Sequence, residues 1–291
     1  MRTDKIDKVI EKFKHQAIEL ALKEDIGNDC DHTSNACIPK NATNKAVLII
    51  KESGIISGVE IAKQIFQKLD KRSVFEQHIA DGTKAKVGET AFTVKCNTRS
   101  LLRAERIVLN IMQRMSGIAT NTARYVELIK DTNVKVLDTR KTAPCLRYFD
   151  KEAVLHGGGH NHRYGLFDMI LLKDNHIDYA GGIEAAIKKT QKYLKKNKLD
   201  LEIEIEVRTF REISQVLAIG GVNRIMLDNF DIPSTKEAVE LINGKYQIES
   251  SGGITFETIR DYALCGIDFV SVGALTHNVK GLDMSLKAVK S

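Results

Sequence analysis

The chain has 291 residues, 43% hydrophobic and 28% charged, so it is long enough for one large or two modest globular domains with a buried core. Lys and Arg (44) exceed Asp and Glu (38), an excess that suits small anionic ligands and is too slight to indicate a nucleic-acid partner. No apolar run approaches the roughly 20 residues that a membrane span needs, so we expect no membrane partner.

The cysteines and the first residues bear on location. Five cysteines lie far apart without a CxxC pair, which is typical of free thiols in a reducing compartment. The opening segment MRTDKIDKVIEKFKHQ has no apolar stretch of the signal-peptide kind, and its acids Asp4, Asp7 and Glu11 disfavour a transit peptide. We therefore expect a cytoplasmic protein.

The first third of the chain mixes helical and strand patterns without an internal repeat. Apolar residues recur at helical spacing or alternate as in strands, and Ser116-Gly117 separates two long helical patterns. This mixture predicts a small α/β sandwich domain over residues 1–115. The expected elements are helices over 4–23, 58–69, 100–115 and 116–130, and strands over 45–52 and 90–96.

From residue 134 onward, short β-branched runs alternate regularly with helical patterns. Such alternation predicts βαβ units and a parallel sheet. The expected strands cover 134–138, 169–174, 203–207, 224–228, 247–250 and 268–272, and the helices cover 180–197, 210–220, 234–244 and 255–266.

Each of these strands begins apolar and ends in residues that can do chemistry, such as Asp138, Lys173 and Asp228. In a β/α barrel the active site lies at the carboxyl ends of the strands, whereas a doubly wound sheet concentrates function at one or two switch points. Six polar endings in succession favour an α/β fold with an incomplete, TIM-like β/α barrel over residues 116–275, which carries the active site. We expect segment 276–291 to rejoin the N-terminal domain.

The strand-end and loop groups contain more cations than acids. Converging cations repel one another unless an anion lies between them, and Arg and Lys suit carboxylates and phosphates. Glycine turns after the last two strands suit a phosphate held on backbone N–H groups, while paired acids indicate a metal, sugar hydroxyls or a developing positive charge. The candidates are Arg140, Lys141, His162, Arg163, Lys173, Glu206, Asp228, Gly252, Gly253 and Gly273.

Each signal also has a purely structural interpretation. An Arg-Lys pair is commonly a solvated surface feature, and the alternating Glu202, Glu204 and Glu206 suit one solvated face of a strand. Four histidines between His156 and His176 suggest a metal site, but no carboxylate completes a ligand set on one predicted helix face. Surface residues have no reason to recur at successive strand ends, which favours the functional interpretation.

Nine motifs, in order along the chain, carry a family resemblance. They are ALKEDIGNDCDHTS (21–34), RAERIVLNIMQRMSGIAT (103–120), TRKTAPCLR (139–147), GGGHNHR (157–163), LLKDNH (171–176), IEIEV (203–207), MLDN (226–229), ESSGGI (249–254) and SVGALTH (271–277). Together they resemble the quinolinate phosphoribosyltransferases, also called nicotinate-nucleotide pyrophosphorylases (carboxylating), from about residue 15 to about residue 285.

The resemblance implies a glycosyltransferase of the pentosyltransferase class, acting in pyridine nucleotide and de novo NAD biosynthesis. Such an enzyme joins quinolinate, a pyridine dicarboxylate, to 5-phosphoribosyl-1-pyrophosphate with Mg2+, and forms nicotinate mononucleotide, pyrophosphate and CO2. It also implies a homodimer with shared active sites, in which the N-terminal domain of one subunit covers the barrel mouth of the other and brings Arg106 to it.

The resemblance further implies roles for individual residues. The arginines and His162 would bind the two carboxylates, Lys141, Lys173 and His277 would face phosphates, and the glycine turns would hold the 5-phosphate. The implied substrate-binding residues are Arg106, Arg140, Thr142, His162, Arg163, Ser251, Gly252, Gly253, Gly273, Ala274 and His277. The implied catalytic residues are Lys141, Lys173, Glu206 and Asp228, of which Glu206 and Asp228 would also hold Mg2+, directly or through water.

The chain departs from the family pattern at three places. Cys145 stands where glycine is common, and Glu152 where an aromatic residue is common. Either change can reshape the loop after the first barrel strand, but neither removes a charged group. The loop at 27–34 also departs from the usual GxGDxT spacing, which concerns the N-terminal domain.

Two alternatives stay open beside the family activity. A paralogous phosphoribosyltransferase acting on another anionic acceptor would share the architecture, although a monocarboxylate needs fewer cations than this chain supplies. A non-catalytic sensor of phosphate ligands belongs to a different class, and it would gain nothing from Glu206 and Asp228.

Overall fold

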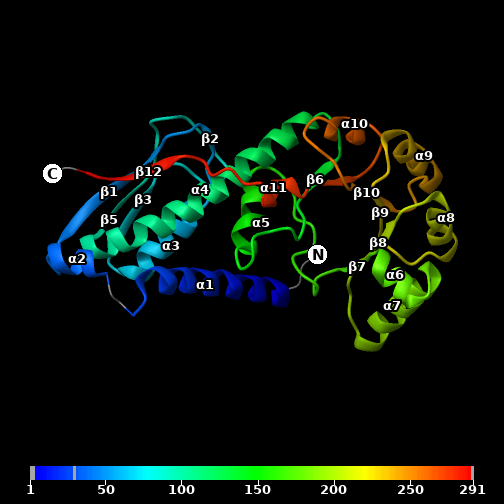
Figure 1. Cartoon of the computed structure of the whole chain (residues 1–291), viewed down its shortest axis with the longest axis horizontal. Helices are drawn as coiled ribbons and strands as arrows, with labels where there is room; N and C mark the ends of the chain where they lie inside the picture. The colour runs from blue at the N-terminus through cyan, green and yellow to red at the C-terminus, as the bar shows by residue number, and fades with distance from the viewer. Residues whose placement is uncertain (1–3, 29–30, 290–291) are drawn as a thin grey trace. The chain divides into compact units, whose positions relative to one another are not determined.

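The computed structural model describes residues 4–28 and 31–289, so Cys30 lies outside the described residues. The chain divides into two compact units, whose elements are labelled in Figure 1. The first unit, here called the sandwich unit, comprises 1–124, 141–159 and 275–291; the second, the barrel unit, comprises 125–140 and 160–274. No described helix has the length and apolar character that crossing a membrane requires.

A four-stranded antiparallel sheet forms the centre of the sandwich unit, in the order β12-β1-β5-β3. The last strand of the chain pairs with the first, with Leu286 opposite Leu48, so the C-terminal segment completes this sheet. The strands are β1 (Thr43–Ile50), β3 (Val74–Gln77), β5 (Thr90–Asn97) and β12 (Met284–Ala288).

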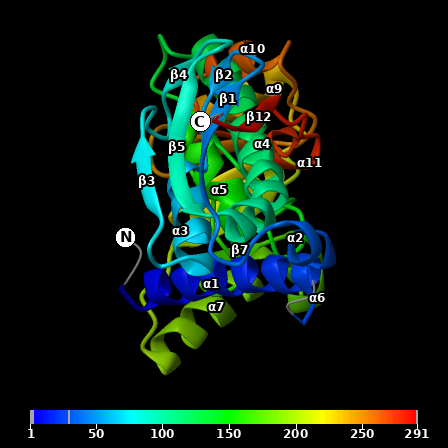
Figure 2. The ribbon, with the colours of Figure 1, turned by 90° about the vertical axis from the view of Figure 1, so that its left-hand side faces the viewer.

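Helices α3 and α4 lie against one face of this sheet (Figure 2). Phe66 of α3 packs edge-on against Phe92 of β5, with 6.1 Å between ring centroids, and both side chains are fully buried. The larger helices are α1 (Asp4–Ile26), α3 (Val59–Leu69), α4 (Thr98–Leu128) and α5 (Arg147–His156). The shorter elements are α2 (His32–Cys37), β2 (Gly54–Ile55), β4 (Lys84–Ala85) and α11 (Ala274–His277).

Helix α4 corrects one prediction from the sequence, because it is a single helix where two were expected. Ser116 is fully buried and exchanges hydrogen bonds with the backbone of Ser57. A side chain on Gly117 would lie 2.1 Å from the carbonyl oxygen of Lys280. Ser116 and Gly117 therefore permit close packing rather than a helix break, and α4 runs through the expected domain boundary at 115.

Six parallel strands form the barrel unit, in the order β6-β11-β10-β9-β8-β7. The order does not close into a ring, so the predicted incomplete β/α barrel is confirmed. Its helices lie along the outer side of the strands (Figure 1). The strands are β6 (Lys135–Leu137), β7 (Ile170–Leu172), β8 (Ile203–Val207), β9 (Arg224–Asp228), β10 (Gln247–Ser251) and β11 (Phe269–Ser271), and the helices are α6 (Asp174–Ala180), α7 (Ile183–Asn197), α8 (Phe210–Ile219), α9 (Ile232–Ile242) and α10 (Ile259–Ala263).

The contact at Gly117 leads to a first prediction. Gly117→Ala places a methyl group against the backbone of Lys280, so we expect overpacking to lower the free energy of unfolding by about 1–3 kcal/mol. Gly281→Ala is the matched control, because its new methyl group would lie 3.5 Å from Gln113, an ordinary contact. Urea unfolding followed by circular dichroism measures both, and equal midpoints for the two variants would contradict the packing argument.

Candidate active site

Acids and glycine turns meet at the carboxyl ends of adjacent barrel strands. Asp228, the last residue of β9, lies directly opposite Ser251, the last residue of β10. Glu206 of the neighbouring strand β8 lies opposite Met226, one pleat deeper. The parallel alignment therefore places Glu206, Asp228 and the turn after Ser251 at one end of the sheet.

Glu206 is a buried carboxyl group among other charges. Its side chain is 8% exposed, and the Nζ atom of Lys173 lies 3.5 Å from it. Burial raises the pKa of Glu206 above its ordinary value, and although Lys173 opposes this shift, the Asp228 and Asp174 carboxylates add to it. The interpretation of Glu204 and Glu206 as a solvated face is wrong, because both are buried inside the barrel.

The Ser-Gly-Gly turn has a structural requirement for glycine at 252. Gly252 adopts a φ of +93°, and a side chain there would lie 2.2 Å from the Oδ1 atom of Asn229. Asn229 donates a backbone hydrogen bond to the Ser251 carbonyl at 2.9 Å and a side-chain hydrogen bond to Asp228 at 2.8 Å. The turn and the acid are thus tied together, and any larger residue at 252 would separate them.

Two arginines approach each other at the same end of the sheet. Arg163 is 8% exposed, whereas Arg140 is exposed to solvent. Burial lowers the pKa of the Arg163 guanidinium, and the neighbouring Arg140 charge lowers it further. Arg163 stays charged, because an arginine pKa remains far above neutrality. Two cations held this close favour an anion between them.

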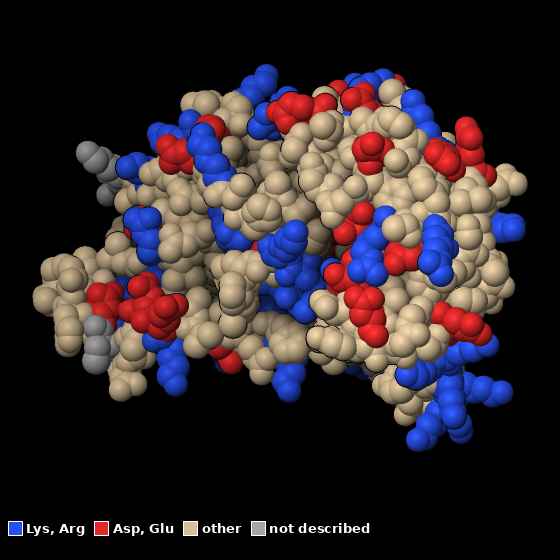
Figure 3. Space-filling model, turned by 45° about the vertical axis from the view of Figure 1, so that its right-hand side comes forward, with Lys and Arg blue, Asp and Glu red and all other residues tan. Residues whose placement is uncertain are grey.

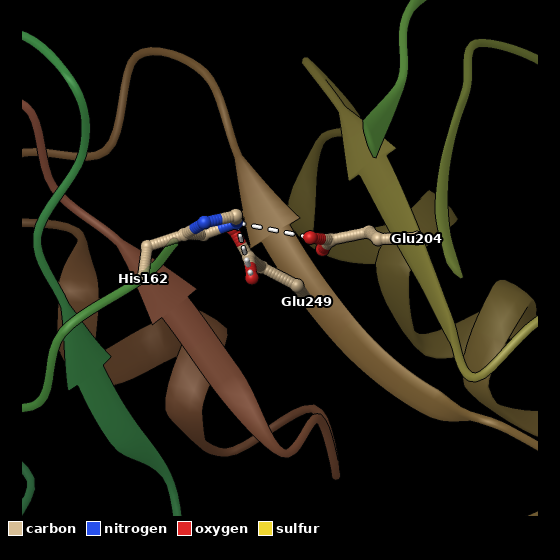
Figure 4. Close-up of side chains that lie close together, drawn as sticks. All are labelled: His162, Glu204 and Glu249. Atoms are coloured by element: carbon tan, nitrogen blue, oxygen red, sulfur yellow. Dashed lines mark ion pairs between the residues drawn. The ribbon is translucent and has the colours of Figure 1, made fainter. Parts of the chain in front are cut away.

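A buried ionic cluster lies in the barrel interior, and Figure 4 shows three of its members. The Nε2 atom of His162 lies 3.0 Å from Glu204 and 3.5 Å from Glu249, and Arg224 donates to Glu249 at 2.9 Å. The ligand atoms of His162, Glu204 and Glu249 lie within 4.8 Å of one another, close enough to share a metal ion. Arg224 lies against both carboxylates, as does His162, so we interpret the cluster as an ion-pair network.

Sequence reasoning identified His162 but missed the chemical roles of Glu204, Glu249 and Arg224. Glu204 and Glu206 are two residues apart on one strand and therefore face the same side. This spacing could have predicted that Glu204 points inward together with Glu206. Glu249 and Arg224 lie in the middle and at the start of their strands, where polar residues are not expected to face a buried interior.

Of the remaining predicted site residues, Gly273 and Ala274 follow β11 in the barrel unit, and four belong to the sandwich unit. Arg106 is exposed on α4, and the Oγ1 atom of Thr142 accepts a hydrogen bond from Arg147 at 3.1 Å. The Lys141 carbonyl accepts a hydrogen bond from Thr276, at 3.0 Å. The fourth predicted residue of this group, His277, ends α11.

The structure explains why glycine is common at one departure from the family pattern. Cys145 is exposed and has a φ of +64°, a left-handed conformation that glycine adopts without strain. The loop therefore keeps the glycine geometry although its residue is a cysteine. Glu152, the second departure, is partly buried within α5.

The surface carries charges of both signs on the face shown in Figure 3. Basic side chains project together at the lower right, where Figure 1 places α7. The last turn of α7 carries Lys195 and Lys196, and cations at this end of a helix are stabilised by its dipole. This basic group has a structural explanation that needs no ligand.

The fold and the strand-end groups together define a β/α-barrel enzyme for an anionic substrate. Residues 118–287 match the model of the quinolinate phosphoribosyl transferase C-terminal domain, and residues 31–116 match that of the N-terminal domain. The chain belongs to the quinolinate phosphoribosyl transferase family, as the sequence motifs predicted.

Curated relatives and solved structures agree with this assignment. The chain is 45% identical to quinolinate phosphoribosyltransferase (decarboxylating) 2, mitochondrial, of Nicotiana glauca, over 94% of this chain and 81% of that protein. It is 38% identical to the probable nicotinate-nucleotide pyrophosphorylase (carboxylating) of Bacillus subtilis, over 92% and 91%. The structure of the nicotinate-nucleotide pyrophosphorylase from Francisella tularensis is 37% identical, with a TM-score of 0.88 and 96% of each chain covered.

The interior cluster predicts a dependence of stability on pH. Burial, with the Glu204 charge adding, raises the pKa of Glu249 from 4.5 to about 7. The folded protein then binds more protons than the unfolded chain between these values, so this group lowers stability as the pH rises through that window. Glu249→Gln stays neutral, so we expect it to reduce this loss by on the order of 1–3 kcal/mol.

Urea unfolding at about pH 5 and about pH 7 measures this effect. Glu237→Gln is a suitable control, because Glu237 is exposed on α9. A Glu249→Gln variant with the same difference in stability between the two pH values as the wild-type protein would contradict the assignment.

Proposed function

We propose that this protein transfers the phosphoribosyl group of 5-phosphoribosyl-1-pyrophosphate to quinolinate with decarboxylation, giving nicotinate mononucleotide, pyrophosphate and CO2. The family membership supports this reaction of NAD biosynthesis. The structural observation that carries the proposal is the mutual influence of the charges of Arg140 and Arg163. Glu206 and Asp228 lie at the carboxyl ends of barrel strands. A substrate with two carboxylates compensates such a pair of cations.

The proposed roles in the barrel unit follow from charge and position. Arg140 and Arg163 bind carboxylates of quinolinate, because each guanidinium offers a planar fork of donors. Lys173 faces the phosphates of the donor. Glu206 and Asp228 hold ribose hydroxyls and stabilise the positive charge that develops on the ribose as pyrophosphate leaves.

The remaining steps need few protein groups. The ring nitrogen of quinolinate attacks C1 of the ribose, the bond to pyrophosphate breaks, and the ring becomes a cation. The adjacent carboxylate then departs as CO2, and the electron pair left on the ring carbon takes up a proton. We propose that Ser251, Gly252, Gly253, Gly273 and Ala274 hold the 5-phosphate through backbone N–H groups.

The acids of the site fit Mg2+. The Asp228 and Asp174 carboxylates add to the raised pKa of Glu206, and carboxylate oxygens are the ligands that Mg2+ prefers. We propose that Glu206 and Asp228 hold the ion, directly or through water. When bound, it neutralises charge on the pyrophosphate.

Two further proposals concern assembly and location. We propose a homodimer in which Arg106 of one subunit completes the active site of the other. The exposure of Arg106 on α4 supports this, since a solvated arginine is available to a partner. We also propose a cytoplasmic location, although the Nicotiana relative is named mitochondrial.

A decarboxylation assay tests the proposed function. Purified protein with quinolinate labelled in the carboxylate next to the ring nitrogen, the ribosyl donor and Mg2+ should release labelled CO2 and form nicotinate mononucleotide. Absence of labelled CO2 under these conditions would defeat the proposal, and product from nicotinate alone would favour the paralogous activity instead.

The assay is sharper with one matched pair of variants. Arg140→Ala should raise the KM for quinolinate, with a loss of about 2–5 kcal/mol in binding, because a carboxylate loses its charged partner. Lys192→Ala removes one positive charge from the exposed surface of α7 and should leave that KM unchanged. Equal values for the two variants would argue against carboxylate binding by Arg140.

A further inference from the structure

A bidentate ion pair joins helices α4 and α5 within the sandwich unit. The Nε and Nη2 atoms of Arg114 donate to the two carboxylate oxygens of Asp150, at 2.7 and 2.8 Å. Asp150 is fully buried, whereas the side chain of Arg114 is 26% exposed. A buried ion pair is by itself weak evidence for stability, because both groups lose their hydration when the chain folds. The other contacts of this pair are more informative about its role.

Each partner of the pair also holds a backbone group from another segment. The Oδ2 atom of Asp150 accepts a hydrogen bond from the backbone N–H of Ala143, at 3.1 Å. The Nη2 atom of Arg114 donates to the backbone carbonyl of Thr276 in α11, at 3.1 Å. Figure 1 shows α5 and α11 beside α4. One ion pair thus anchors both the loop 141–146 and the short helix α11.

A further hydrogen bond joins these two segments directly. The hydroxyl of Thr276 donates to the backbone carbonyl of Lys141, at 3.0 Å. Thr276 is only 1% exposed, so water does not compete for this hydrogen bond. The loop is therefore held at two points, the Lys141 carbonyl and the Ala143 N–H, which are two residues apart.

The anchored backbone carries two side chains that suit a phosphate ligand. Lys141 belongs to the anchored loop, His277 directly follows Thr276, and both are exposed to solvent. The family resemblance implied contacts with phosphates for both residues. A backbone that is already fixed lowers the ordering cost of binding, since the ligand has to order only the side chains.

We propose that Arg114 and Asp150 are positioning residues. Their ion pair fixes the loop 141–146 and α11 relative to each other, so that Lys141 and His277 are preset for the phosphates of the ribosyl donor. A purely structural ion pair would instead stabilise the fold without favouring either substrate. The inference rests on the proposed function for the identity of this ligand.

Thr276→Val tests the connection with the least disturbance, because valine keeps the shape and removes only the hydroxyl. We expect the Kd for 5-phosphoribosyl-1-pyrophosphate to rise about threefold or more, and the Kd for quinolinate to change clearly less. Thr122→Val is the matched control, since the Thr122 hydroxyl is equally buried and forms no hydrogen bond within the described part of the chain. It should leave both constants unchanged.

Calorimetric titration measures both constants without turnover. The ribosyl donor is titrated in the presence of Mg2+ and phthalate, a dicarboxylate that lacks the reacting ring nitrogen, and quinolinate is titrated without the donor.

Arg114→Lys tests the ion pair itself. Lysine keeps a positive charge beside Asp150, but it lacks the planar fork that reaches both carboxylate oxygens and the Thr276 carbonyl. We expect the Kd for the ribosyl donor to rise about tenfold or more, and the Kd for quinolinate clearly less. Arg260→Lys is the matched control and should change neither constant, because Arg260 forms the same bidentate pair with Asp131 and also donates to a backbone carbonyl.

The outcomes separate this inference from the proposed function. Equal shifts for the two ligands, or an unchanged Kd for the donor in Thr276→Val, would overturn the positioning role, and circular dichroism shows whether each variant is folded. The expected shifts together with an inactive decarboxylation assay would defeat the proposed function and keep this inference. A wild-type protein that does not bind the ribosyl donor would overturn both.

Discussion

The parallel alignment of six barrel strands is the constraint on which the rest of the site depends. Because all six carboxyl ends lie at one end of the sheet, residues separated by more than a hundred positions in the sequence become neighbours. Arg140, Glu206 and Asp228 come from three such strand ends. The chemistry follows from this alignment. Arg140 lowers the pKa of Arg163, and the Asp228 carboxylate adds to the raised pKa of Glu206, so like charges are held together and favour ligands of opposite charge.

The fold could be predicted largely from local patterns. Alternating β-branched and helical runs gave all six barrel strands, because a buried parallel strand is apolar along its length and its chemical residues fall at its end. The Ser116-Gly117 pair led to the wrong prediction of two helices where α4 is continuous. Residues that break an isolated helix also allow a close contact within a packed one. Strand β3 and helix α5 carry weaker patterns, and only their tertiary packing identifies them.

The site could be predicted in part. Residues at strand ends, such as Glu206 and Asp228, are visible because a polar residue interrupts an apolar run. Glu204 and Glu249 lie within their strands rather than at the carboxyl ends. Their ion-pair partners, His162 and Arg224, come from distant segments of the chain. Their pairing depends on strand register, which a sequence pattern does not specify.

The central claim is that cations at the strand ends recognise a substrate with two carboxylates. Calorimetric titration of the protein with quinolinate and with nicotinate, which has one carboxylate fewer, tests it most directly. The account predicts that quinolinate binds at least about tenfold more tightly and that added salt reduces this difference. Equal affinities for the two ligands at low salt would contradict it.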